Sequence, residues 1–375
     1  MPPLTRSSPA KINLTLRVVG LRPDGFHEIE SLVARVSLHD TITAHPAPDG
    51  RRTLSCDDPS LPTDRGNLAL RAADELARAT GSDFGVHLEL AKRIPAGAGL
   101  GGGSSNAATT LALLNDLWSL GVADLARIGA ALGSDVPLFF HSPLCILRGR
   151  GDQIEDVFAG QARGDAGVDR TDSESGADRS RPAAAGEQLE RPPASVPAAE
   201  PSQRAGDRDV PDKRSEEGTG TSPAAATEHS EAPRLGASPL LRPAAPAADP
   251  LTTHAILLLG GGFCRTPAVY AAWDRDPPTE PRPPLANVLA RLADPPALSA
   301  ILFNDLEEPA LATYPDLRVW ITAIRRLCPG PVRMTGSGSA FFTLCTSAEE
   351  ARDLADRLAA DGPQPLQAVS VTFRA

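Results

Sequence analysis

The sequence predicts an α+β protein with two folded domains, and three observations lead to this class. The chain has 375 residues, about twice the length of an average domain. Some short runs alternate apolar and polar residues, as strands do, while other runs repeat apolar residues at helical spacing. The composition changes between residues 160 and 250, so we expect one domain over residues 1–159 and a second over residues 251–375.

The segment from 160 to 250 is rich in Pro, Ala, Gly, Ser and charged residues and shows no periodicity. No aromatic residue lies between Phe158 and Phe263. Such a segment buries too little apolar area to offset the entropy lost on ordering. We therefore predict a disordered, low-complexity insertion between the two domains.

The overall composition argues against several classes of partner. The net charge is −10 and the pI is near 5.3, which is unlike a protein that binds nucleic acid or an anionic membrane surface. No apolar run approaches the roughly 20 residues that span a bilayer. The five cysteines show neither C-x-x-C nor metal-ligand spacing, and Met1–Thr5 lacks the apolar core of a signal peptide. We expect reduced thiols, a cytoplasmic location and a small-molecule substrate.

The first predicted strand, Ala10–Val18, alternates strictly between apolar and polar residues. Lys11 and Asn13 share its polar face. The chain has only three lysines against many arginines, so a lysine here suggests a compact point charge. An ordinary exposed strand lysine is the alternative.

A glycine-rich loop dominates the middle of the first domain. It comprises Pro95, Ala96, Gly97, Ala98, Gly99, Leu100, Gly101, Gly102, Gly103, Ser104 and Ser105. A helix follows, with Ser104 or Ser105 as the expected N-cap. A glycine loop that leads into a helix N-terminus offers unpaired N–H groups to an anion, so we predict a phosphate-binding loop.

Three alternative interpretations of this loop are weaker. Gly97, Gly99 and Gly102 satisfy G-x-G-x-x-G, but residues 92–95 separate them from the preceding strand, Phe84–Leu90. A Walker A loop needs Lys before Ser104, where this chain has Gly103. A flexible linker would not lead into an amphipathic helix.

Several polar residues of the first domain have both a structural and a functional interpretation. His27 follows a Pro23–Gly25 turn and precedes a strand over Glu28–Leu38. Asn67 is a possible N-cap of a helix that reaches about Thr80. Lys92 follows the strand before the glycine loop, where it either adds charge beside phosphates or is simply solvated.

Asp135 lies in the sequence Gly133-Ser134-Asp135-Val136-Pro137. Asp124 is the expected cap of the helix before it, which ends at Gly133. Because the residue before a proline disfavours helix, Asp135 is expected on a constrained loop. A turn or cap aspartate is the alternative interpretation.

The second domain contains another glycine turn, Thr335–Ser339, between strands Val332–Met334 and Phe341–Cys345. A helix starting at Thr266-Pro267 follows a buried strand at Ala255–Gly260, with Thr266 as its expected cap. The remaining predicted elements are helices at Leu285–Leu292, Leu317–Leu327 and Ser347–Ala359 and a strand at Ala368–Phe373.

Four of these motifs, taken in order, resemble the GHMP kinase superfamily: Pro9–Asn13, the glycine loop, Gly133–Pro137 and Thr335–Gly338. The resemblance covers nearly all of the chain outside residues 160–250, a segment that the family lacks. It implies an N-terminal ribosomal-S5-domain-2-like domain and a C-terminal ferredoxin-like domain. It also implies ATP-dependent phosphorylation of a small-molecule alcohol. The extended loop is most similar to the branch that phosphorylates the 2-hydroxyl of a cytidylated polyol in isoprenoid precursor biosynthesis.

The resemblance also implies roles for individual residues. Lys11 and Asp135 would be catalytic, and Asn67 and Lys92 would join the glycine loop in binding ATP. The implied substrate-binding residues are Asn13, Phe26, His27, Thr266, Tyr270, Gly336 and Gly338. Phe26 stands where the family often has Tyr, so a ring is kept and a hydroxyl is lost. The chemistry implies Mg²⁺ with the ATP; no ligand is identified beyond Ser105 as a candidate.

Other functions stay open at this point. A related kinase acting on mevalonate or homoserine would share the four motifs, although the Pro23–His27 stretch argues against it. A catalytically inactive binding protein would not need both Lys11 and Asp135. An NAD-dependent oxidoreductase is disfavoured by the position of the glycine loop. Monomer and homodimer are both compatible with the sequence.

Overall fold

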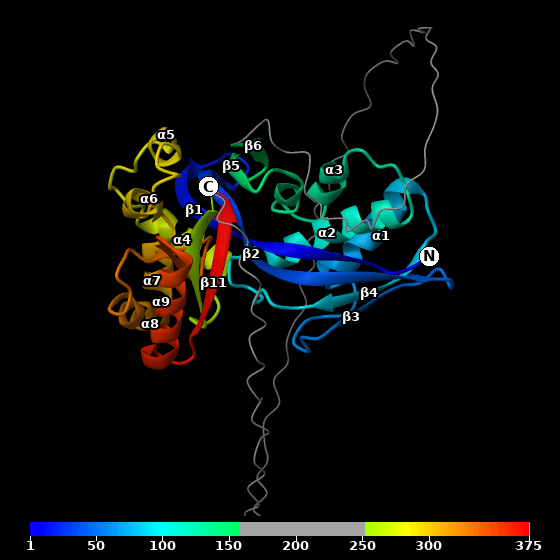
Figure 1. Cartoon of the computed structure of the whole chain (residues 1–375). Coiled ribbons are helices and arrows are strands. Elements are labelled where there is room, and N and C mark those ends of the chain that lie inside the picture. Colours follow the sequence, from blue (N-terminus) through cyan, green and yellow to red (C-terminus); the bar gives the residue numbers. More distant parts are fainter. Residues whose placement is uncertain (158–251, 375) are drawn as a thin grey trace, which may run out of the picture. The chain divides into compact units, whose positions relative to one another are not determined.

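The computed structural model describes residues 1–157 and 252–374, and these belong to one compact unit (Figure 1). The predicted insertion, residues 160–250, lies outside the described residues. Elements of the first domain are β1 (Leu4–Leu21), β2 (His27–Ala47), β3 (Arg52–Cys56), α1 (Leu68–Thr80), β4 (Gly85–Ala91), α2 (Gly102–Leu117), α3 (Leu125–Ala130), the 3₁₀ helix η1 (Pro137–Phe140), β5 (Leu144–Arg148) and β6 (Gln153–Asp156).

The first domain is built on the long antiparallel pair of β1 and β2. β4 and then β3 extend the sheet beyond β2, while β5 and β6 form a branch that also pairs with β2. α1 and α2 pack against each other and against the strands (Figure 1). Leu76, Leu88, Leu111 and Leu114 are fully buried where these layers meet.

The second domain has a four-stranded antiparallel sheet in the order β11-β7-β10-β9. Its elements are β7 (Thr252–Leu259), α4 (Thr266–Arg275), α5 (Leu285–Leu289), α6 (Pro295–Ile301), β8 (Phe303–Asn304), α7 (Glu307–Thr313), α8 (Pro315–Arg325), β9 (Arg333–Met334), β10 (Phe341–Cys345), α9 (Ala348–Asp361) and β11 (Gln367–Arg374). Along the chain, a strand, helices, a β-hairpin, a helix and a last strand follow one another. This sequence of elements, with the sheet order given above, is the ferredoxin-like arrangement. The prediction for this domain is confirmed.

One short strand joins the two domains. β8 leaves the second domain and pairs in parallel with β1, so that Thr15 lies opposite Phe303 and Leu16 opposite Asn304. Asn304 is buried and donates to the carbonyls of Met334 and Gly336, both at 2.8 Å. Its Oδ1 accepts from the amide of Leu306 at 2.9 Å. One side chain thus fixes the start of the second glycine turn relative to the shared sheet.

The first strand differs from its prediction. It runs from Leu4 to Leu21, and both of its faces are covered between Ala10 and Leu16. Lys11 and Asn13 are therefore buried along with Ile12 and Leu14. The strict alternation was correct, but the face expected to be solvated is covered by the two glycine turns.

Several short elements were absent from the prediction: β3, β6, β8, α6 and α7. Each is seven residues or shorter, and none carries a long periodic pattern. All five cysteines are free, and Cys145, Cys264 and Cys345 are buried, as expected. Burial raises the pKa of Cys145 to about 12.

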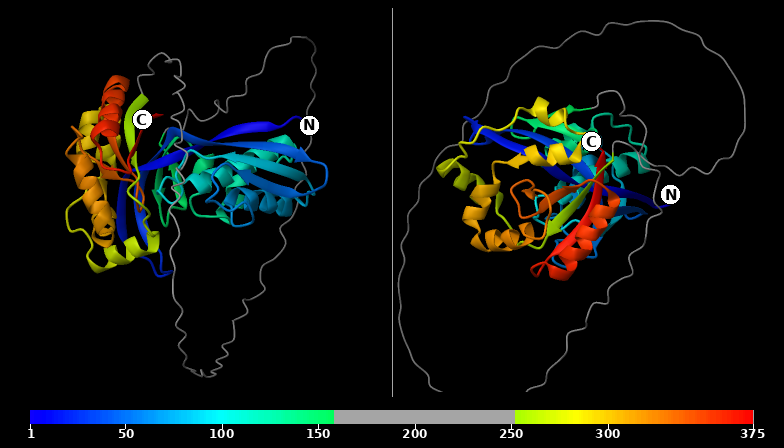
Figure 2. Two further views of the ribbon diagram at one scale, coloured as in Figure 1. Left: turned by 90° about the horizontal axis from the view of Figure 1, so that it is seen from below. Right: turned by 60° about the vertical axis from the view of Figure 1, so that its left-hand side comes forward.

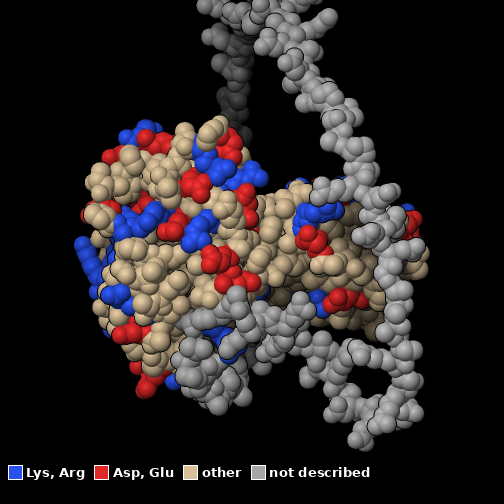
Figure 3. Space-filling view, turned by 90° about the horizontal axis from the view of Figure 1, so that it is seen from above, with Lys and Arg blue, Asp and Glu red and all other residues tan. Residues whose placement is uncertain are grey.

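The surface of the described residues mixes both signs of charge. Figure 3 shows basic and acidic side chains interspersed on the face in view, and the two further ribbon views show both domains side by side along β1 and β2 (Figure 2). Within residues 1–157 and 252–374, no helix combines the length and the apolar character needed to cross a bilayer.

We predict that Asn304→Ala lowers the free energy of unfolding by about 3 kcal/mol, because two carbonyls and one amide lose a buried partner. Urea denaturation followed by circular dichroism measures this change. Asn287→Ala, on the exposed side of α5, is the matched control and should cost less than about 0.5 kcal/mol. Equal effects of the two substitutions would show that Asn304 does not hold the junction.

Candidate functional site

The glycine loop is held by its small apolar residues while its glycines bend the chain. Gly97, Gly99 and Gly101 have φ values of 70°, 79° and 71°, a region that glycine adopts without strain. Ala98 and Leu100 between them are buried in the core. The carbonyl of Leu100 accepts from the Lys11 amide at 2.9 Å, and that of Ala98 accepts from the Ala340 amide at 3.2 Å.

These contacts use the carbonyls of the loop and not its amides. No described residue accepts a hydrogen bond from the amides of residues 97 to 101. The first turn of α2 follows immediately, and the first amides of a helix have no intrahelical partner. A concave run of unpaired N–H groups at a helix N-terminus is suited to bind phosphate.

The start of α2 corrects the predicted cap. The helix begins at Gly102 with Gly101 as its N-cap, and no side chain caps it. Ser105 already lies in the first turn, where its buried hydroxyl accepts from Ser8 at 2.8 Å. Glycine replaces serine as the cap because Gly101 turns against Lys11 and Phe139, which leave little room for a side chain.

The second glycine turn packs directly on the first. A side-chain carbon on Gly99 would meet the carbonyl oxygens of Thr335 and Gly338, each at 3.0 Å. One on Gly336 would meet the Gly99 oxygen at 3.1 Å and the Lys11 ammonium at 3.5 Å. Two motifs more than 230 residues apart in the sequence thus meet at Lys11, which explains why both are glycine-rich.

Lys11 lies at the centre of this arrangement. Its side chain is buried, and its Nζ donates to Asn13 Oδ1 at 2.7 Å. Asn13 is held in turn, since its Nδ2 donates to Ser31 and its amide donates to Thr335, both at 2.8 Å. Burial lowers the pKa of Lys11, and the negative charge of Asp135 partly opposes this effect.

Asp135 faces the same space from the loop between α3 and η1, as the sequence predicted. It is partly exposed and forms no ion pair with a described residue; its contact is the Ser134 hydroxyl at 3.4 Å. Its charge acts on Lys11 and also on Tyr270, whose pKa is raised to about 12 by burial and then by Asp135. The negative charge of Asp135 thus acts on both the Lys11 ammonium and the Tyr270 phenol.

A cluster of aromatic side chains adjoins this space. His27 stacks on Tyr270 with ring centroids 4.5 Å apart, and its edge faces Trp273 at 5.6 Å. Its Nε2 lies 2.7 Å from Asp274 Oδ1. Phe26, by contrast, is 54% exposed, and the Arg150 guanidinium lies 5.2 Å from its ring centre. The structure brings His27 and Tyr270 together and leaves Phe26 at the surface.

Thr266 belongs to the site in a different way from its prediction. α4 begins at Thr266 itself, and the N-cap is Arg265, which makes no capping hydrogen bond. The Thr266 hydroxyl lies 2.7 Å from that of Ser337 in the second glycine turn. The hydroxyl therefore joins α4 to that turn instead of capping the helix.

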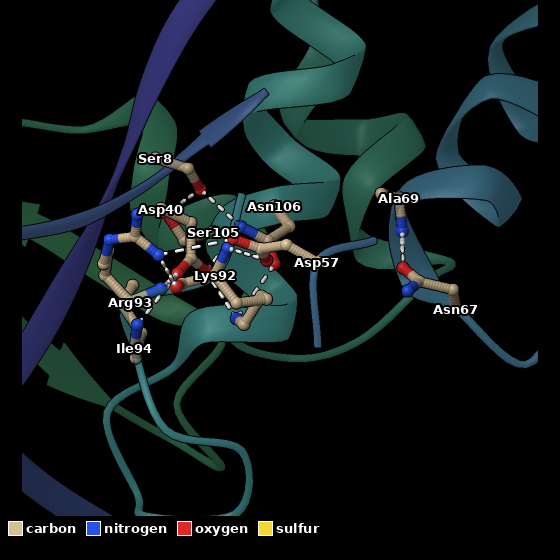
Figure 4. A network of polar contacts seen from close by, with 10 residues as sticks. All are labelled: Ser8, Asp40, Asp57, Asn67, Ala69, Lys92, Arg93, Ile94, Ser105 and Asn106. Carbon is tan, nitrogen blue, oxygen red and sulfur yellow. Dashed lines mark hydrogen bonds and ion pairs between the residues drawn. The ribbon is translucent and has the colours of Figure 1, made fainter. Parts of the chain in front are cut away.

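Two residues predicted to bind ATP have their polar groups engaged elsewhere. Asn67 caps α1, since its Oδ1 accepts from the Ala69 amide at 3.0 Å and its Nδ2 donates to Pro62 (Figure 4). Lys92 forms an ion pair with Asp40 at 2.5 Å, and the Asp40 side chain is fully buried. Neither of the two interpretations of Lys92 offered by the sequence describes this buried pair.

Sequence reasoning missed Asp40, Trp273 and Asp274. Asp40 interrupts an apolar and β-branched run inside β2, and an acidic residue is uncommon in a strand; that was an available signal. Asp274 follows Tyr270 by one helical turn, so the sequence could also have predicted that both lie on the same face of the helix. The sequence could not have predicted which distant residue pairs with Asp40 or with Asp274.

Family models match two segments of the chain, one in each domain. Residues 67–142 match the N-terminal domain of the GHMP kinases, and residues 286–364 match the GHMP kinase C-terminal domain.

Curated relatives share a common name. A 4-diphosphocytidyl-2-C-methyl-D-erythritol kinase of Salinibacter ruber is 50% identical over 158 residues, which are 41% of this chain and 55% of that protein. One of Synechococcus is 46% identical over 157 residues, 41% of this chain and 51% of that protein. The chain thus spans about half the length of the curated relatives it matches.

Solved structures match over a longer range. A crystal structure of 4-(cytidine 5'-diphospho)-2C-methyl-D-erythritol kinase aligns over 99% of this chain and all of that chain, with a TM-score of 0.63 and 28% identity. A homoserine kinase from Cytophaga hutchinsonii aligns over 100% of this chain and 95% of that one, with a TM-score of 0.53 and 11% identity. The second likeness concerns the fold alone.

We predict that Gly99→Ala weakens ATP binding by at least about tenfold, because the new methyl group would push the loop off Thr335 and Gly338. Isothermal titration calorimetry with ATP measures the affinity. Gly81→Ala is the matched control: Gly81 has a φ of 66° but no atom within 4 Å of the added carbon. It should lower stability by about 1 kcal/mol through backbone strain and leave ATP affinity unchanged. Unchanged affinity in Gly99→Ala would contradict the role given to the packed turns.

Proposed function

Since the chain belongs to the GHMP kinases, we propose that it transfers the γ-phosphoryl group of ATP to the 2-hydroxyl of 4-diphosphocytidyl-2-C-methyl-D-erythritol. The products are the 2-phosphate and ADP, a step in the methylerythritol phosphate route to isoprenoid precursors. The observation that carries the proposal is the convergence of both glycine turns and Asp135 on the buried Lys11. The choice of acceptor is supported by the names of the curated relatives.

The donor phosphates would lie against the glycine loop. Phosphoryl transfer has a loose transition state, so an enzyme acts mainly by positioning the groups and neutralising charge. The unpaired amides of residues 97–101 and the first turn of α2 supply fixed positive dipoles. Because glycines line the bend, the phosphates can approach the backbone closely.

Asp135 would receive or orient the proton of the acceptor hydroxyl. Its carboxylate is partly exposed and forms no ion pair with a described residue; its contact is the Ser134 hydroxyl. A carboxylate in this state accepts a hydrogen bond from an alcohol and takes its proton as the oxygen attacks phosphorus. Tyr270, which stays protonated at neutral pH because its pKa is near 12, can donate a hydrogen bond beside it.

Lys11 would offset charge at the transferring phosphoryl group. The ammonium lies next to Gly336 and the Gly99–Gly101 bend, so it is close to where the terminal phosphate would sit. Asn13 accepts one of its hydrogen bonds and fixes its direction. The field of Asp135 favours its charged form.

Kinase chemistry uses Mg²⁺ with ATP, and the residues here fit an ion that is carried mainly by the nucleotide. The described residues contain no cluster of three or more acidic, His or Cys side chains able to hold a metal. Ser105 has its hydroxyl buried against Ser8. Mg²⁺ commonly keeps several waters and binds through one or two protein oxygens together with phosphates, which a lone Asp135 would satisfy. Bound in this way, it would neutralise phosphate charge.

The aromatic cluster would bind the rest of the acceptor. His27, Tyr270 and Trp273 present ring faces and edges of the kind that bind a base by stacking. The same small-molecule acceptor would reach Asp135 at its other end. The free thiols are consistent with a cytoplasmic enzyme, which we also propose.

The direct test is a coupled assay of ADP release with ATP and 4-diphosphocytidyl-2-C-methyl-D-erythritol, with mevalonate and homoserine in parallel. We expect turnover with the cytidylated acceptor alone. Asp135→Asn should lower kcat by about 10²- to 10⁴-fold, since proton acceptance is lost while the shape is kept. Turnover with homoserine or mevalonate instead would keep the kinase class and reject the acceptor. Near-normal kcat in Asp135→Asn would remove that residue from the mechanism.

We further predict that, as the pH rises, Lys11 loses its proton, and the protein its activity, at a lower pH than an ordinary lysine would give. The pKa of Lys11 is lowered in the folded state. Between this lowered pKa and the usual lysine pKa of about 10.4, the unfolded chain binds the proton and the folded chain does not. Stability therefore rises with pH across this window while kcat/KM falls.

Lys11→Met checks this prediction. It should lower kcat by at least about 10²-fold at neutral pH while the thermal midpoint stays equal to or above that of the wild type, because a buried ammonium has been removed. Measurements of kcat/KM and of the thermal midpoint from pH 7 to 10.5 are required. A clear drop in the thermal midpoint of Lys11→Met at pH 7 would contradict the assignment.

A further inference from the structure

We infer that Asp40 is a positioning residue of the phosphate loop. This inference rests on the proposed function of that loop in binding ATP. Asp40 lies inside β2, is fully buried, and touches neither Lys11 nor Asp135 through any hydrogen bond of the described residues. Its carboxylate instead joins the two ends of the glycine loop (Figure 4).

The strand registers explain how Asp40 reaches both ends. β2 pairs with β1 so that Asp40 lies opposite Ser8. The pairing of β2 with β4 ends at Thr41 opposite Ala91, so Asp40 lies just beyond the last pair, where the chain leaves β4 toward the loop. A side chain at this point can therefore contact what enters the loop and what leaves it.

One carboxylate oxygen holds the entry to the loop. Oδ1 accepts from the amide of Arg93 at 2.7 Å and from the amide of Ile94 at 2.8 Å. Ile94 is 1% exposed, and the loop begins at the next residue, Pro95. Two charge-assisted hydrogen bonds to successive amides fix the direction in which the chain starts the loop.

The other oxygen holds the exit from the loop. Oδ2 accepts from Asn106 Nδ2 at 2.9 Å and from Lys92 Nζ at 2.5 Å. Asn106, the fifth residue of α2, also donates to Ser8 at 3.0 Å, next to the Ser8–Ser105 hydrogen bond. The N-terminus of α2, where phosphates would bind, is thus tied to β1 and β2.

In this arrangement Lys92 has a structural role, the pairing of Asp40, and not the predicted contact with ATP. A buried carboxylate is costly unless it is paired, and Lys92, with 9% of its side chain exposed, supplies the charge. Its Nζ also lies 3.4 Å from Asn106 Oδ1. The ion pair offsets the cost of burying the carboxylate, whose two oxygens accept four hydrogen bonds beneath the loop.

The test measures ATP binding directly, so that it does not depend on the acceptor. In Asp40→Asn, Oδ1 can still accept from the two amides, but the new NH₂ group meets Lys92 and Asn106 as another donor. We expect the Kd for ATP to rise at least about tenfold. In hydrogen exchange, the amides of residues 93–106 should exchange faster while the rest of the chain keeps its protection.

A double variant provides the rescue. Asp40→Asn with Lys92→Met removes both charges, and Asn106 can turn its amide so that its oxygen accepts from the NH₂ group introduced at position 40. We expect most of the ATP affinity to return, and with it the protection of residues 93–106. Asp74→Asn is the matched control: Asp74 lies on α1, away from the loop, and the substitution breaks its ion pairs with Arg52 and Arg65 but should leave the Kd unchanged.

Three outcomes would overturn the inference, and they are distinguishable. Faster exchange over the whole chain in Asp40→Asn would mean a general loss of stability. An unchanged Kd in Asp40→Asn, with wild-type protein that binds ATP, would reject the positioning role and leave the proposed function intact. A wild-type protein that does not bind ATP would reject the proposed function and this inference with it.

Discussion

The burial of one ammonium group inside a sheet is the constraint on which this site depends. Lys11 lies on a central strand whose two faces are both covered, and moving a charge out of water is costly. The structure compensates with one hydrogen bond to Asn13 and the field of Asp135, and two closely packed glycine turns lie against the lysine side chain. Glycine is required at Gly99 because the carbonyls of Thr335 and Gly338 approach its backbone, and at Gly336 because the Gly99 carbonyl and the Lys11 ammonium do.

The two lysines of the first domain show how burial separates structural from chemical charge. Lys92 is neutralised by direct contact with Asp40. Lys11 has a neutral amide as its contact and lies in the field of a carboxylate that forms no ion pair within the described residues. A charge that is neutralised by a direct ion pair can organise a loop, but it attracts a charged ligand only weakly. A charge whose partner is at a distance remains available to an incoming phosphate.

The alternation of apolar and polar residues was enough to predict β1, and the glycine pattern was enough to predict both turns, because each reflects a local requirement of the backbone. The ferredoxin-like order of the second domain followed from the family resemblance and is confirmed. What local patterns could not give is which residues meet across the fold. The burial of Lys11 and Asn13, the Asp40–Lys92 pair and the Asn304 junction all depend on contacts between distant segments. The short elements β8 and α7 lacked enough residues to show a period.

Helix α4 shows how such distant contacts are coordinated. Its residues Thr266, Tyr270 and Asp274 are spaced four apart, so they lie along one face of the helix. The first contacts Ser337 of the second glycine turn, the second stacks on His27, and the third contacts Nε2 of the same histidine ring. Tyr270 also lies in the field of Asp135, so one helical face relates the second glycine turn, the carboxylate and the aromatic cluster. A rigid helix with this spacing fixes the distances among the three, so in the proposed reaction an acceptor bound at His27 would be positioned relative to the glycine turns.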